Sequence, residues 1–284
     1  MQYPLDYVTE ESRQRDKARA RAVLANRPLA VDKFRVCNVS FLNSAPFRAL
    51  RQTDWLHYEE SSPAECARRL HEREADLAFI PIVEFAMHGG YAALPFGIVG
   101  RGPVDSVLLL SDLPLEELRT VYVDAASQTS AMLARLMLKA EGQDHVFFAR
   151  TAGEALLDAA RESRVPSGVV VIGDRSRELR SAFRHATDLS QWWWERHQLP
   201  FVFAVWAYRP GAISELQRDE LIAAMGDAVE NGIIYGRQWA DEFGLEREVA
   251  EQYLRHRISF PLTSEACHGA DIFLREAREQ GLLP

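Results

Sequence analysis

The chain has 284 residues, of which 47% are hydrophobic, and this is enough apolar side chain for one large core or two of moderate size. A formal net charge of −8 argues against a protein that binds nucleic acid or an anionic membrane through a broad basic surface. The three cysteines, Cys37, Cys66 and Cys267, are far apart in the sequence and none belongs to a CxxC pair. The sequence therefore predicts neither a disulfide framework nor a structural zinc site.

The first 33 residues are predicted to be an extension that precedes the folded core. Residues 10–21 are charged and favour a helix, but no apolar run of about 7–15 residues with a small-residue cleavage site accompanies them. No other segment reaches the roughly 18 uninterrupted apolar residues of a membrane-spanning helix. We therefore expect a soluble, cytoplasmic protein that spans no membrane.

From residue 34 onward, strand-like and helix-like segments alternate. Most of the strand-like segments are continuous apolar runs, which is the pattern of strands buried on both faces of a largely parallel sheet. The sequence therefore predicts an α/β fold. The predicted strands are 34–40, 56–60, 77–81, 106–110, 120–124, 146–149, 168–172 and 201–208.

Helix-start signals occur between these strands. The segments Ser62–Glu65 and Thr151–Glu154 are capping boxes, and the first of them carries a proline in its first turn. Residues 127–140 form an amphipathic pattern. After residue 210 the pattern is helical only, with predicted helices at 214–235, 246–256 and 264–280.

The order of these elements predicts two lobes. A strand near 106–112 leaves the first lobe and the strand near 201–208 returns to it, so lobe I comprises 34–111 and 203–284 and lobe II comprises 112–202. Two hinge strands without a flexible linker imply a cleft that closes on a small ligand. The alternative is one doubly wound sheet.

The first polar turn lies where an apolar strand runs into Asn43 and Ser44, with Pro46 in the first turn of a predicted helix. Proline fits there because the amide hydrogen that it lacks would be unpaired. The two side chains would lie beside free backbone N–H groups at the positive end of the helix dipole, which can bind a carboxylate or a phosphate. The alternative is an ordinary turn with a capping serine.

Two further turns place hydroxyl groups at the ends of apolar strands, where open α/β sheets bind ligands. The turn at 101–106 presents Ser106, and the turn at 124–130 clusters Ser127, Thr129 and Ser130 at a helix N-terminus. The alternatives are a turn-capping role for Ser106 and plain N-capping by Ser127, which would explain one hydroxyl but not three.

A fourth turn, at 173–175, follows the strand at 168–172 and offers Asp174 as a ligand contact; the alternative is a surface turn with a solvated ion pair. Glu84 is the acid nearest the predicted cleft, and we expect it to cap or pair there. The eight histidines show neither HExxH nor HxH spacing and no acidic partner at ligand spacing. We therefore predict no metal site.

Six segments together resemble the family of menaquinone biosynthetic chorismate dehydratases, which belong to the futalosine route. The resemblance covers roughly residues 34–280 and depends on the order and spacing of short motifs. It implies a type II periplasmic-binding-protein fold, in which two α/β lobes enclose a ligand cleft. The motifs are Val39–Pro46, Asp76–Glu84, Arg101–Val107, Asp124–Ser130, Ile172–Asp174 and Leu199–Trp206.

The resemblance also implies an activity, the removal of water from chorismate to give 3-[(1-carboxyvinyl)oxy]benzoate, without a cofactor. It implies that Asn43 and Ser106 are catalytic residues of the cleft, and that Thr129 and Ser130 hold a carboxylate of this dicarboxylate substrate. The residues that we expect to bind the substrate are Ser44, Ser127, Thr129, Ser130 and Asp174.

No strong general base stands on the four turns, so we hypothesise that the substrate's own enolpyruvyl carboxylate accepts the ring proton. Three alternative functions are a solute-binding protein of the same fold, the sister enzyme dihydroxynaphthoate synthase and a ligand sensor. The first would need an export signal, the second a histidine in the cleft and the third a DNA-binding helix-turn-helix, and the sequence presents none of these features. The oligomeric state is not predicted.

Overall fold

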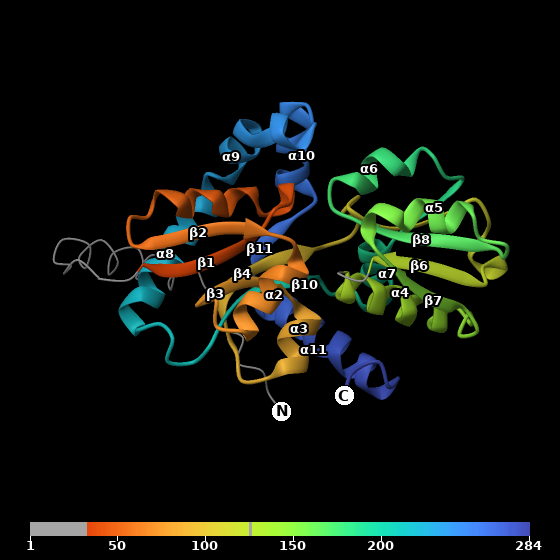
Figure 1. The fold of residues 1–284 in the computed structure, drawn as a ribbon, viewed down its shortest axis with the longest axis horizontal. Coiled ribbons are helices and arrows are strands. Elements are labelled where there is room, and N and C mark those ends of the chain that lie inside the picture. Colours follow the sequence, from red (N-terminus) through yellow and green to blue (C-terminus); the bar gives the residue numbers. More distant parts are fainter. Residues whose placement is uncertain (1–32, 125–126) are drawn as a thin grey trace.

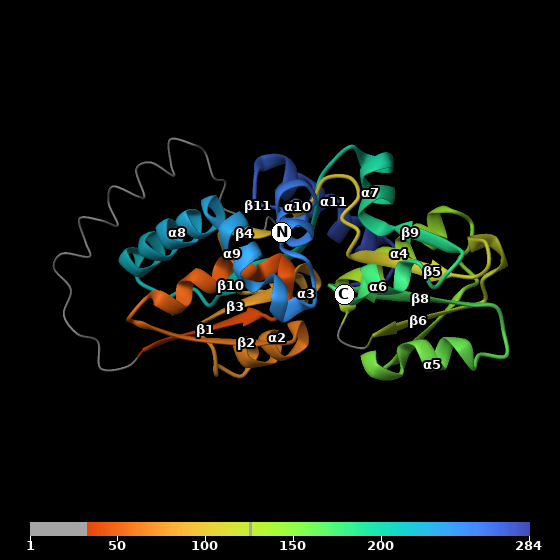
Figure 2. The ribbon, with the colours of Figure 1, turned by 90° about the horizontal axis from the view of Figure 1, so that it is seen from above.

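Two separate β-sheets organise the chain, and they lie side by side (Figures 1 and 2). The computed structural model describes residues 33–124 and 127–284, so the predicted extension lies outside the described residues except for Lys33. The first sheet has the order β11 (Ser259–Pro261), β4 (Ala92–Gly100), β10 (Phe201–Tyr208), β3 (Leu77–Pro81), β1 (Phe34–Val39) and β2 (Leu56–Ser61). The second has the order β7 (Phe147–Thr151), β6 (Thr120–Asp124), β8 (Ser167–Ile172), β5 (Val107–Ser111) and β9 (His185–Asp188).

Helices cover both sheets, and short 3-10 helices (η) form several of the connections (Figure 1). Among the described residues, no helix is both long and apolar enough to cross a membrane. The helices that follow strands of the first sheet are η1 (Leu42–Gln52), α2 (Pro63–His71), α3 (Ile82–His88), α8 (Glu215–Glu230), α9 (Gly232–Trp239), η4 (Ala240–Phe243), α10 (Arg247–His256) and α11 (Ser264–Glu279). The helices that follow strands of the second sheet are η2 (Leu115–Glu117), α4 (Gln128–Ala140), η3 (Gly153–Ala155), α5 (Leu156–Arg161), α6 (Arg175–Arg180) and α7 (Leu189–His197).

The two-lobed prediction is confirmed, but the sheets are mixed rather than largely parallel. β1 pairs with β2 and β3 in parallel, whereas β10 runs antiparallel to β3 and β4. In the second sheet, β5 runs antiparallel to both β8 and β9. The strands that run against the main direction of their sheets are β10 and β11 in the first sheet and β5 in the second. Two of them, β5 and β10, follow the crossings between the sheets.

Every predicted strand is present, with bounds that agree to within about two residues. The strands that the pattern did not predict are β4, β9 and β11. β4 contains Pro95 and Gly97, which weaken a strand pattern, and β9 is the largely polar segment His185–Asp188 at a sheet edge. β11 has three residues and interrupts a region that was predicted to be helical only.

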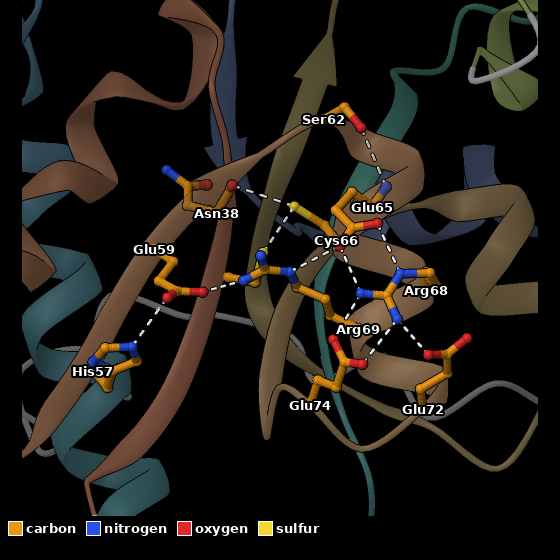
Figure 3. Close-up of polar contacts among 11 residues, drawn as sticks. Asn38, His57, Glu59, Ser62, Glu65, Cys66, Arg68, Arg69, Glu72 and Glu74 are labelled. Atoms are coloured by element: carbon orange, nitrogen blue, oxygen red, sulfur yellow. Dashed lines mark hydrogen bonds and ion pairs between the residues drawn. The ribbon is translucent and has the colours of Figure 1, made fainter.

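The predicted helix starts differ in detail from the structure. Pro46 lies inside the 3-10 helix η1 rather than in the first turn of an α-helix. The Ser62 box is partly confirmed, because the Ser62 hydroxyl accepts a hydrogen bond from the Glu65 N–H at 3.3 Å and caps α2 (Figure 3). The second box is wrong. β7 continues through Thr151, and α5 begins without a side-chain cap from any described residue.

The structure places the two crossings close together. β4 ends at Gly100 in the first sheet and β5 begins at Val107 in the second, so the first crossing precedes the predicted boundary at residue 111. The return crossing ends at Phe201, which pairs with Gly100. These two connections are therefore the candidate hinges. Helix α11 packs against both β10 and α4, so it contacts both lobes.

Arg48 is the buried cation of the first lobe. Its guanidinium donates to both carboxylate oxygens of Glu60 at 2.8 Å and to Glu242 at 2.9 Å, and it lies 4.8 Å from the ring centroid of Trp239. Because Arg48 belongs to η1, Glu60 to β2 and Glu242 to η4, this one side chain ties three distant segments together. Removing one partner of a buried ion pair leaves an uncompensated charge.

We expect Arg48→Met to lower the free energy of unfolding by about 3 kcal/mol, because the buried carboxylate of Glu60 loses its main partner. Urea denaturation followed by circular dichroism measures the change. Arg51→Met is the matched control, since Arg51 also pairs with Glu60 but its side chain is 40% exposed. We expect the control to lower the free energy of unfolding by less than about 1 kcal/mol. Equal losses from the two variants would contradict the interpretation.

Candidate active site

A cavity that is partly open to solvent lies between the two sheets. The first sheet and its helices contribute one wall, and β5, β8 and the start of α4 contribute the other. The lining side chains are mostly apolar, and the polar ones are neutral. The lining residues are Val39, Phe41, Asn43, Pro63, Pro81, Ile98, Ser106, Val107, Ser127, Gln128, Thr129, Ser130, Ile172, Gly173, Phe203, Ala204 and Ile258.

Asn43 reaches this cavity from η1, the turn that follows β1. The apolar residues Leu42, Ala45 and Phe47 of the same segment are buried in the core and anchor η1. The Oδ1 atom of Asn43 is buried and has no hydrogen-bond partner among the described residues. A buried acceptor of this kind is costly unless a ligand or water completes it.

Ser106 enters from the opposite lobe, immediately before β5. The turn that carries it has Gly102 at φ 82° and Asp105 at φ 58°, both in the left-handed region, where glycine is free and aspartate is tolerated. The Asp105 N–H donates to Asp188 at 2.7 Å, and the Gly173 N–H donates to the carbonyl of Ser106 at 2.8 Å. These bonds hold the serine hydroxyl at the cavity wall.

Tyr253 is the neighbour of Ser106 that sequence reasoning missed. Its hydroxyl donates to the Ser106 Oγ at 2.8 Å, and burial raises the pKa of the phenol, so the hydroxyl keeps its proton at neutral pH. The Asn43 side chain lies beside the same hydroxyl, and its hydrogen bond lowers the pKa of the phenol, against the effect of burial. The guanidinium of Arg177 lies 3.9 Å from the ring centroid of Tyr253. Nothing in the local pattern of α10 distinguishes this tyrosine from a core residue.

Ser127, Thr129 and Ser130 lie at the N-terminal end of α4 and line the same cavity, as predicted from their clustering. Ser127 is the N-cap residue, but its hydroxyl makes no capping bond to any described residue. The Oγ of Ser127 and the Oγ1 of Thr129 are buried and have no partner among the described residues. Plain N-capping therefore does not account for these hydroxyls, which remain available to a ligand.

Ser44 and Asp174, the other two predicted binding residues, do not line this cavity. The Ser44 hydroxyl lies 2.5 Å from the carbonyl oxygen of Val39 and 2.9 Å from that of Phe41, so it is committed to the turn and is not part of the cavity lining. Asp174 lines an adjoining cavity that shares Phe41 with the first. Its carboxylate accepts a hydrogen bond from the Leu42 N–H at 3.3 Å across the two lobes.

Gln128 connects the cavity wall to a charged cluster behind it. Its side-chain amide donates a hydrogen bond to Glu84 on α3, in the other lobe. Among the described residues that line the cavity itself, none is titratable. Its polar groups are hydroxyls, amides and the backbone N–H groups of a helix N-terminus, a donor set that suits an anion without a fixed countercharge.

Two sheets joined by two crossings, with a cavity between them, define the class of periplasmic-binding-protein-like folds. A protein from Archaeoglobus fulgidus has the same fold, with a TM-score of 0.75 at 17% identity over 90% of this chain and 100% of that one. The alkanesulfonate-binding protein SsuA from Xanthomonas axonopodis pv. citri, bound to MOPS, gives a TM-score of 0.66 at 12% identity over 90% and 96% of the two chains. At such identities the likeness shows the fold alone.

The sequence comparisons narrow this class to one family. A family model described as menaquinone biosynthesis matches residues 34–279. The chain is also 30% identical over 241 residues to the chorismate dehydratase of Thermus thermophilus. The aligned region covers 78% of this chain and 82% of that protein. The chain therefore belongs to the menaquinone biosynthesis family, and the family predicted from the order of the motifs is confirmed.

Asp174 leads to a prediction about pH. Because burial raises the pKa of its carboxyl, the folded state binds this proton more tightly than the unfolded state does. Stability therefore falls as pH rises from the ordinary pKa of 3.8 up to the raised value, and the deficit persists above it. We expect Asp174→Asn to remove this loss. The free energy of unfolding of the variant should therefore increase relative to that of the wild type as the pH rises from about 4 to 7.

Urea unfolding of both proteins at several pH values across that range measures this difference. A difference in unfolding free energy that stays constant, or that shrinks as the pH rises, would show that burial does not control this carboxyl.

Proposed function

We propose that the protein removes water from chorismate to give 3-[(1-carboxyvinyl)oxy]benzoate, and so acts as a carbon–oxygen lyase of menaquinone biosynthesis. The observation that carries the proposal is a set of buried oxygens that face one cavity from both lobes and have no hydrogen-bond partner in the part of the chain that the structure describes: Asn43 Oδ1, Ser127 Oγ and Thr129 Oγ1. The name of the Thermus thermophilus relative, chorismate dehydratase, supports the choice of substrate.

The charge and shape of chorismate agree with the donors of the cavity. Chorismate carries two carboxylates, a ring hydroxyl and an apolar diene ring. The start of α4, with the hydroxyls of Thr129 and Ser130 and its free N–H groups, is a seat for one carboxylate. The apolar walls formed by residues such as Phe41, Ile98 and Phe203 suit the ring.

Ser106 is suited to assist departure of the hydroxyl group. A serine hydroxyl has one proton to donate, and the Ser106 oxygen already accepts the proton of Tyr253, so its own proton is free to point to another acceptor. Accepting a hydrogen bond also polarises the serine and strengthens it as a donor. We assign to Ser106 the hydrogen bond that stabilises charge on the leaving oxygen, and to Asn43 the positioning of that group.

The mechanism also requires a group that accepts the ring proton. The ring proton and the hydroxide leave together as water, and the ring becomes aromatic, so the reaction is strongly downhill and requires no redox partner. None of the described residues that line the cavity is titratable. This supports the hypothesis that the substrate's own enolpyruvyl carboxylate takes the proton, while the protein holds the reacting groups in the required geometry.

The roles of the two catalytic residues are tested by Ser106→Ala and Asn43→Asp. We expect each variant to lower kcat by about 10²–10³, the usual loss when one preorganised donor to a developing charge is removed. The ultraviolet absorbance of chorismate follows turnover directly. Ser111→Ala is a control at the far end of β5, the strand that follows Ser106, because the Ser111 hydroxyl bonds the Leu113 carbonyl and lies outside the cavity lining.

Full turnover by both variants would show that these two roles are wrong. If the wild-type protein binds chorismate but leaves it intact, the chain is a binding protein of the same fold and not a lyase.

Thr129 tests the carboxylate seat separately from the chemistry. We expect Thr129→Val to raise KM about tenfold with little change in kcat, because a hydrogen bond to a charged group contributes about 1.5–3 kcal/mol to binding in both ground and transition states. Steady-state kinetics measure the two parameters. An unchanged KM, or a loss confined to kcat, would exclude a binding role for this hydroxyl.

A further inference from the structure

Two histidines and a glutamate converge behind the cavity wall, at the contact between α2 and α3. The Nε2 atom of His71 lies 3.2 Å from Glu84 Oε2, and the Nε2 atom of His88 lies 3.3 Å from the same oxygen. The three ligand atoms all lie within 4.8 Å of one another. His71 ends α2, while Glu84 and His88 lie one turn apart on α3.

These separations agree with the coordination shell of a small divalent metal. In a tetrahedral site with bonds of about 2.0–2.1 Å, neighbouring ligand atoms lie about 3.3 Å apart. Both measured separations to Glu84 match that value. A His₂Glu set leaves the fourth position open to water, and imidazole with carboxylate is a ligand combination that zinc accepts.

The residues around the three ligands already form the outer contacts that metal ligands need. The Nδ1 atom of His71 lies 2.7 Å from the Tyr91 hydroxyl. When that nitrogen carries the proton and donates it to Tyr91, the Nε2 lone pair faces Glu84 and can bind a metal. The second carboxylate oxygen of Glu84, Oε1, accepts a hydrogen bond from Gln128, so both buried ligands are oriented by a further group.

The site is also accessible. The side chain of His88 is 48% exposed, whereas those of His71 and Glu84 are 19% and 10% exposed. An ion can therefore enter past His88 and reach a carboxylate that is held in place. The ring centroids of His71 and His88 lie 3.6 Å apart with an angle of 31° between the ring planes, so the two imidazoles already lie side by side.

We propose that His71, Glu84 and His88 bind one divalent transition-metal ion of the zinc class per chain. The proposal is independent of chorismate, because none of the three residues lines the cavity. The ion would fix Glu84, and Glu84 holds Gln128, which does line the cavity from the other lobe. Metal binding would therefore strengthen the contact between α3 and α4.

Cobalt(II) is the probe, because it occupies zinc sites and its visible absorption reports the ligand geometry. The full chain is treated with a chelator, dialysed and titrated with Co²⁺, and then with Zn²⁺ in competition. We expect one equivalent to bind with a four-coordinate spectrum that Zn²⁺ abolishes. We also expect Zn²⁺ to raise the melting temperature, because a ligand that binds only the folded state stabilises it.

Variants separate this site from adventitious binding. We expect His88→Ala to abolish the spectrum and the thermal shift, and Tyr91→Phe to weaken affinity about tenfold, as outer-contact changes do. His57→Ala is the matched control, since His57 lies 3.1 Å from Glu59 and is 58% exposed, but no third ligand joins that pair (Figure 3) in the described part of the chain. We expect it to bind the metal as the wild type does.

Two results would overturn the proposal. One is the absence of a stoichiometric Co²⁺ spectrum and of a thermal shift in the wild-type protein. The other is binding that His88→Ala leaves intact, or that His57→Ala removes equally, which would show a surface effect. Neither result bears on turnover of chorismate, so failure here is distinct from failure of the proposed activity.

Discussion

A buried oxygen without a hydrogen-bond partner costs a folded protein about 1–3 kcal/mol, and the cavity between the two sheets has three buried oxygens with no partner among the described residues. Asn43 contributes one from the first lobe, and Ser127 and Thr129 contribute two from the second. A ligand or water that brings complementary groups would offset this cost. These three oxygens are therefore polar contacts that the cavity offers to a ligand.

The double crossing of the chain explains how such distant residues meet. Ser106 stands where the chain enters the second sheet, directly after the first crossing, and Asn43 stands on the turn after β1. The C-terminal helices then return to the first lobe, and α10 delivers the Tyr253 hydroxyl to Ser106 from 147 residues away. Ser106 is therefore contacted from both lobes, and its geometry depends on how the lobes are placed.

Charged side chains pair with one another outside the cavity, whereas the polar side chains that line the cavity are neutral. The net charge of −8 is the excess of 41 acidic over 33 basic residues. Carboxylates and arginines also pair in clusters, as around α2, where Arg68 and Arg69 both bond Glu65 (Figure 3). The cavity instead presents neutral donors and a helix N-terminus. An acidic protein can hold a doubly charged anion under these conditions, because fixed dipoles at close range act more strongly than screened charges outside the site.

The sequence by itself determined the positions of eight of the eleven strands that the structure describes, the α/β class and the turns that carry Asn43, Ser106 and the α4 hydroxyls, because apolar runs and turn residues act over short stretches of chain. Local patterns could not determine strand direction, since β5, β10 and β11 run antiparallel to neighbours that lie far from them in the sequence. The same patterns did not distinguish Ser44, which bonds its own turn, from its neighbour Asn43.

Contacts between remote segments were decided by the tertiary structure alone. Tyr253 against Ser106, and Cys37 against Cys66 with sulfurs 3.3 Å apart, have no signature in either local sequence. Glu84 and His88 stand at helical spacing, a signal that the HExxH and HxH patterns do not include, but only the packing of α2 and α3 against β3 brings His71 to them. Side chains that act together are selected by the packing of whole elements, and that packing depends on apolar burial summed over the entire chain.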